Sequence, residues 1–120
     1  MTSAEALILM QQVDVQLAHV WMVRAFLKHS EEAQEDDELT DVHRELYDYM
    51  LALGGPLKAG DADEYLKTAR KKLAKLRRVA ELFAKIQPEV SQHTNFQMAV
   101  ASLSAAVEKI VLLLASEVHR

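Results

Sequence analysis

Apolar residues recur at steps of three and four along almost the whole chain, and this spacing constrains the fold more than any other feature. Such steps place side chains on one face of an α-helix, whereas a half-buried strand requires strict alternation. Leu66, Ala69, Leu73 and Leu76 follow the helical pattern. Only three glycines and two prolines are available to interrupt it. The sequence therefore predicts an all-α protein.

Capping residues mark where helices begin. Thr2 and Glu5 have the spacing of a capping box, in which each side chain bonds a backbone amide of the first turn. Thr94 and Gln97 repeat that spacing. Asp61 is a third candidate, because a carboxylate caps a helix N-terminus well. These residues predict helix starts near positions 3, 61 and 94.

Glycine and proline mark where helices end. We expect Gly54-Gly55-Pro56 and Pro88 to be stops, because glycine supplies a left-handed cap and proline cannot continue a helix. Short connections favour antiparallel neighbours, so we predict an antiparallel up-down four-helix bundle in which residues 1–120 form one domain. The predicted helices cover residues 3–29, 37–53, 61–87 and 94–118.

The first and last predicted helices carry more apolar residues than one buried face requires. In the first, a stripe through Leu9, Val13 and Leu17 suits the core, and a second stripe lies on nearly the opposite side. No helix is central in a four-helix bundle, so a second apolar face indicates an interface. We predict a homodimer through these two helices; loops that cover the first helix are the alternative. The predicted interface consists of Ile8, Val15, Met22, Phe26, Met98, Ala105 and Leu112.

Charged residues are unevenly distributed, although the net charge is only −4. Residues 31–54 carry nine acids against one base, whereas residues 55–90 carry nine bases against five acids. A stripe of bases is usually a solvated face, but it can also attract an acidic protein surface. Nucleic acid is not expected, because the chain is net acidic and no aromatic residues lie among these bases. The basic stripe consists of Lys67, Lys71, Lys75 and Arg78.

No arrangement typical of catalysis or metal binding is present in the sequence. There is no cysteine and no Glu-x-x-His motif of the kind that di-iron bundles use. The five histidines fall in separate segments, so we predict no metal site and no cofactor. Polar residues of the first helix, with one histidine of the second, leave a small-ligand or metal-binding bundle as an alternative. This candidate pocket consists of Gln12, Gln16, His19 and His43.

Arg24 and His29 stand five residues apart, with four residues between them, in the sequence Arg-Ala-Phe-Leu-Lys-His. This spacing resembles the Arg-x4-His signature of the HEPN ribonuclease superfamily, whose domains are also helical bundles. The resemblance covers six residues and implies an RNA-cleaving or nucleotide-binding domain. Arg24 would then stabilise phosphate charge, and His29 would be the acid-base group. The family usually carries the motif on a late helix, and the simpler interpretation is a basic helix C-terminus.

The expected setting is the cytoplasm. The first residues lack the basic start of a secretory signal, and the longest apolar run, at residues 110–115, is too short to span a bilayer. Taken together, these features predict a non-enzymatic helical-bundle protein with an interaction or structural role, homodimeric through its first and last helices.

Overall fold

The computed structural model describes residues 1–115, and these residues are all-helical, as the apolar spacing predicts. The described part of the chain forms six helices and contains no strand. The sequence predicted four, and the predicted end of the last helix at residue 118 lies outside the described residues. The helices are α1 (Ser3–His29), α2 (Glu31–Gln34), α3 (Asp37–Ala59), α4 (Ala62–Lys71), α5 (Leu73–Val90) and α6 (Thr94–Ala115).

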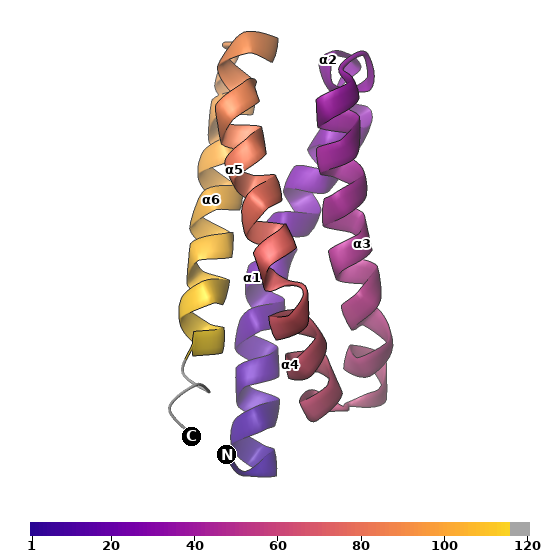
Figure 1. Ribbon diagram of the computed structural model, residues 1–120, viewed down its shortest axis with the longest axis vertical. Coiled ribbons are helices and arrows are strands. Elements are labelled where there is room, and N and C mark those ends of the chain that lie inside the picture. Colours follow the sequence, from indigo (N-terminus) through magenta and orange to yellow (C-terminus); the bar gives the residue numbers. More distant parts are fainter. Residues whose placement is uncertain (116–120) are drawn as a thin grey trace.

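The long helices lie along the longest axis of an elongated molecule of 45 × 25 × 19 Å. α1 contacts α6, α3, α4 and α2, and α5 contacts α3 and α6. In Figure 1, α3 and α6 flank the other long helices, and the short α2 lies at the far end from the chain's start. The first turn of α1 and the last turn of α6 lie at the same end.

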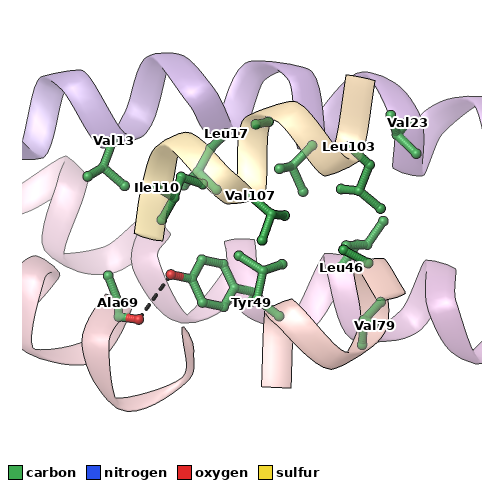
Figure 2. Close-up of a cluster of buried hydrophobic side chains, with 14 of the residues drawn as sticks. Val13, Leu17, Val23, Leu46, Tyr49, Ala69, Val79, Leu103, Val107 and Ile110 are labelled. Carbon is green, nitrogen blue, oxygen red and sulfur yellow. Dashed lines mark hydrogen bonds between the residues drawn. The ribbon is translucent and has the colours of Figure 1, made fainter. Parts of the chain in front are cut away.

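Side chains from all six helices contribute to one hydrophobic core, and Figure 2 shows part of it. Val13 and Leu17 of α1 face Ile110 of α6, and Leu46 of α3 lies near Val79 of α5. The predicted inner stripe of α1 is therefore buried. Each fully buried side chain of this size contributes roughly 1.5–3 kcal/mol relative to an exposed one, so the core ties α1, α3, α5 and α6 together.

The predicted helix end at residue 53 is wrong, because α3 continues through Gly54-Gly55-Pro56 to Ala59. Pro56 stands in the last turn of α3, where its missing N–H removes one hydrogen bond and little helix remains to be disrupted. The left-handed cap is Gly60, with φ of 69°, and its N–H donates to the carbonyl of Leu57. The predicted end at residue 87 is similarly early, since α5 runs past Pro88 to Val90.

The predicted single helix at 61–87 is divided into α4 and α5 at Lys72. In a continuous helix the Ala69 carbonyl would accept from the N–H four residues later. Here it accepts a 3.0 Å hydrogen bond from the buried Tyr49 hydroxyl of α3, drawn as a dashed line in Figure 2. A side chain that takes a carbonyl out of the helical ladder is a recognised cause of a helix break. The break thus satisfies the Tyr49 hydroxyl inside the core.

Two of the three predicted caps are present. Thr2 and Glu5 form the complete capping box, with bonds of 2.9 and 3.1 Å, and the Asp61 carboxylate accepts from the Glu64 N–H. The Thr94–Gln97 box is wrong, although α6 does begin at Thr94. There Nδ1 of the His93 ring accepts from the Asn95 N–H at 3.0 Å. The side-chain amide of Gln97 donates to the backbone carbonyl of Gln92. A histidine ring nitrogen has replaced the threonine hydroxyl as the cap.

Two glycine substitutions test the revised end of α3. Gly54→Ala should stabilise the protein by roughly 0.5–1 kcal/mol, because alanine favours a helix interior and no atom lies within 4 Å of the added Cβ. Gly60→Ala should destabilise it by about 1 kcal/mol, because a left-handed residue disfavours a side chain. Urea unfolding at one protein concentration measures both. A destabilising Gly54→Ala would place the helix end back at residue 53.

Candidate functional site

The outward side of α1 and α6 carries large apolar side chains that the chain itself does not cover. Val15 is 62% exposed, Met22 66% and Leu112 65%, and Ala105 is exposed as well. Single exposed apolar residues need no explanation, but a regular stripe of them along a helix is a candidate interaction surface. We call this set the α1–α6 face. It consists of Ile8, Val15, Met22, Met98, Ala105 and Leu112.

Phe26 is the member of the predicted interface whose ring packs against another helix of its own chain. Its ring contacts the ring of Phe96 in α6, edge to face, with centroids 4.9 Å apart. Phe26 is eighteen residues, or five helical turns, beyond Ile8, so it lies on the same side of α1 as the exposed stripe. The Phe26–Phe96 pair therefore joins α1 and α6. Ala105 is nine residues, or about 180° around α6, from Phe96, so the exposed stripe of α6 lies on the side of that helix away from this contact.

Within the described residues, α1 and α6 are also the two helices long and apolar enough to cross a membrane, judged by length and composition only. Their most apolar stretches are 39% and 33% buried. The longest uninterrupted apolar run did not indicate a span, because small and uncharged polar residues such as Ser102 and Ser104 separate the larger apolar ones. The core helix of a water-soluble protein can have the same composition, and both helices contribute to the core here.

A second exposed apolar region was not predicted from the sequence. It is a groove of about 330 Å³ between α1 and α3. Trp21 and Tyr47 lie along it with Leu51 and Leu57, and each of these side chains is partly exposed. Asp14 also lines the groove, and its carboxylate accepts from the Tyr65 hydroxyl at 3.1 Å. Burial and this neighbouring carboxylate raise the pKa of Tyr65.

Beside the groove, Arg24 is a buried cation, with only 6% of its surface exposed. Its guanidinium lies 4.1 Å from the ring centre of Trp21 and 5.3 Å from that of Tyr47. One terminal nitrogen bonds Nε2 of His43 at 3.1 Å, and the Nε has no hydrogen-bond partner. Two aromatic faces thus replace the carboxylate that usually accompanies a buried guanidinium. Arg24 orders the rings that line the groove.

His43 is held in its neutral form by this arrangement. Arginine only donates hydrogen bonds, so Nε2 of His43 must be the acceptor and carry no proton. Burial lowers the pKa of His43, and the charges of Arg24, Lys28 and Arg44 lower it further. The burial of Arg24 could have been inferred from its position seven residues after Leu17, on the inner stripe of α1. Its partners on α3 could not be read from the chain.

The structure does not bring Arg24 and His29 together. They stand five residues apart on α1, which places them about 140° apart around the helix. Arg24 is buried against His43, while His29 is exposed at the end of α1. A ribonuclease site of the kind that the Arg-x4-His spacing implies would need Arg24 and His29 from two chains to converge on one phosphate, so Arg24 would have to leave its buried place against His43. Arg24 serves the α1–α3 contact instead.

The predicted polar pocket is also divided between two sides of the molecule. Gln12 and His19 are exposed, Gln16 is half-buried, and all three lie on one side of α1. His43 contacts α1 at Arg24, on another side of that helix. Among residues 1–115, no three histidines or carboxylates lie close enough together to hold a metal ion.

The basic stripe is interrupted by the helix break. Lys67 and Lys71 stand on α4, and Lys75 and Arg78 on α5. Lys75 forms a 2.9 Å ion pair with Glu45 of α3, so part of its charge is neutralised within the chain. The other three members are exposed. This ion pair joins α3 and α5.

The buried Arg24–His43 contact should make stability depend on pH. The pKa of His43 in the folded protein is lower than its ordinary value of 6.5. Below pH 6.5 the unfolded chain therefore binds a proton at His43 more readily than the folded protein does. The contribution of His43 to the free energy of unfolding is complete above that pH and decreases as the pH falls. His43→Gln keeps an acceptor for Arg24 but cannot titrate. Its free energy of unfolding should therefore fall less than that of the unmodified protein between about pH 7.5 and pH 5.

Chemical denaturation at both pH values measures this difference. Equal losses of stability in the two proteins would contradict the assignment of His43 as a neutral acceptor.

Comparisons of the chain with models of protein families, with curated proteins and with solved structures give no match. The function of the protein must therefore be inferred from its own surfaces.

Proposed function

We propose that the protein is a non-enzymatic interaction or structural module that acts as a homodimer in the cytoplasm, with a second copy covering the α1–α6 face. In this proposal the six helices act as an antiparallel four-helix bundle, in which α4 and α5 together form one bent member. The exposure of Val15, Met22 and Leu112 is the observation that carries the proposal.

The composition of the α1–α6 face supports association with protein. Its members are aliphatic or methionine side chains on rigid helices, and their inner neighbours are fixed in the core. Burying such side chains removes apolar area from water at roughly 25 cal/mol per Å². The long side of the molecule measures 45 Å by 19–25 Å. That is large enough for the roughly 800 Å² per partner of a standard interface.

The charges around the face support a second copy as the partner. On the exposed side of α6, Glu108 and Lys109 are adjacent and opposite in sign. On α1, the exposed side from Leu7 to Met22 carries no charged residue other than the half-buried Asp14. A surface without net charge does not repel a copy of itself. It also lacks the rows of bases that attach amphipathic helices to anionic lipid.

The proposal is tested by placing a charge on the face. Met22→Asp should weaken self-association by at least about tenfold, because an unpaired carboxylate would be buried at the interface. Leu51→Asp is the matched control, since Leu51 is 64% exposed but lies on α3, outside the α1–α6 face. Sedimentation velocity over a range of concentrations measures both variants.

The expected result is a dimer for the unmodified protein and for Leu51→Asp, and a monomer for Met22→Asp. Circular dichroism should show the same helix content in all three, because both positions are on the surface. An unmodified protein that sediments as a monomer would refute the homodimer. Dissociation caused only by Leu51→Asp would move the interface to the α1–α3 groove.

A further inference from the structure

The α1–α3 groove contains a carboxylate that no cation of the described chain neutralises. Asp14 lines this groove, is half-buried, and forms no ion pair within residues 1–115. The other lining side chains are aliphatic, thioether or aromatic, and one position is a glycine. A charge in such surroundings is costly unless a partner compensates for it. The groove therefore has the negative charge, but not the positive one, of a buried ion pair.

The hydrogen bond between Tyr65 and Asp14 does not require that negative charge. The Tyr65 hydroxyl, from a buried residue of α4, donates to Oδ1 of Asp14 at 3.1 Å. Burial and the carboxylate raise the pKa of Tyr65, so the hydroxyl keeps its proton and remains the donor. The uncharged oxygen of an asparagine amide would accept the same bond. The bond uses one carboxylate oxygen and leaves the charge and Oδ2 to a ligand.

The groove has the size and lining of a small-ligand site. Asp14, Leu17 and Trp21 follow one side of α1 at steps of three and four residues. Tyr47 lies on the opposite wall, and the buried side chains of Leu17 and Leu53 lie beneath. The volume of about 330 Å³ and the mainly apolar lining with few polar groups are typical of sites for small molecules. Asp14 and Trp21 are seven residues apart, or roughly 10 Å along the helix.

Opposite charges at its two ends give the groove a direction. The guanidinium of Arg24 lies against the rings of Trp21 and Tyr47, which makes that end positive. Asp14 is ten residues from Arg24, or roughly 15 Å along α1, and makes the other end negative. A ligand with a cation at one end of an apolar body is complementary to this arrangement. Its cation is attracted by Asp14 and repelled by Arg24, so it can enter in one orientation only.

We propose that the α1–α3 groove binds a small organic cation, with an ammonium group at Asp14 and an apolar body against Trp21 and Tyr47. The ammonium donates a charge-assisted hydrogen bond to the carboxylate, which is stronger than a bond between neutral groups. The aromatic rings supply apolar contact to the rest of the ligand. The groove is separate from the α1–α6 face, so this inference goes beyond the proposed homodimer and does not depend on it.

Trp21 reports on the groove directly, because it is the chain's single tryptophan. Its fluorescence is followed while the protein is titrated with phenylbutylamine, phenylbutanol or phenylbutyrate, which share one apolar body and differ in the charge of the end group. Asp14→Asn removes the negative charge but keeps an acceptor for Tyr65. Gly54→Leu fills the groove, since Gly54 lines it and no atom lies within 4 Å of an added Cβ. Circular dichroism checks the helix content of both variants.

We expect the unmodified protein to bind phenylbutylamine at least about tenfold more tightly than phenylbutanol, and phenylbutyrate most weakly. In Asp14→Asn the affinity for the amine should fall to that for the alcohol, because the amine loses its charged acceptor. In Gly54→Leu the fluorescence should respond to none of the three compounds.

Several results would overturn the proposal. Fluorescence of the unmodified protein that no compound changes would show that the groove binds no ligand of this class. Equal affinities for the three compounds would leave an apolar surface suited to the helix of a partner protein. A preference for the amine that persists in Asp14→Asn, or binding that persists in Gly54→Leu, would place the cation site elsewhere on the molecule.

Discussion

The structure depends on α1, which has to serve the core on one side and still carries an apolar stripe on the other. Its inner residues pack against α6, α3 and α4, and Val13 and Val20 are completely buried. A 120-residue chain does not have enough helices to surround α1. The outer stripe, like that of α6, is therefore exposed in the single chain. Covering this surface is the physical requirement that the proposed homodimer meets.

The sequence predicted what local chemistry controls. The Thr2–Glu5 cap and the Asp61 cap depend on residues three apart, and the inner stripe of α1 depends on helical spacing. The same spacing identified Ile8, Val15 and Met22 as surplus to the core. These features need no knowledge of the other helices.

The sequence did not predict what distant contacts control. The break at Lys72 depends on the hydroxyl of Tyr49, which is twenty residues from Ala69 along the chain. The burial of Arg24 depends on His43 and Tyr47, which lie on another helix. The sequence predicts a stop at Pro56, because proline breaks helix interiors. It is tolerated because it falls in the last turn, before the left-handed Gly60.

Arg24 illustrates how burial changes the interpretation of a motif. A basic residue near a histidine suggested phosphate chemistry, but the guanidinium lies between two aromatic rings and donates to a neutral imidazole. A buried cation of this kind positions its neighbours rather than a substrate. It keeps Trp21 and Tyr47 along the α1–α3 groove, on a different side of α1 from the exposed stripe. The groove and the exposed stripe are thus separate surfaces of α1, and the proposed homodimer would leave the groove accessible.

The most direct test of the central claim is the molar mass of the unmodified chain in solution. Sedimentation equilibrium over a wide range of concentrations should give twice the chain mass of 13.5 kDa at high concentration. On dilution the mass should fall toward that of one chain. A mass of one chain at every concentration would contradict the account, because the α1–α6 face would then remain exposed to water without a second copy to cover it.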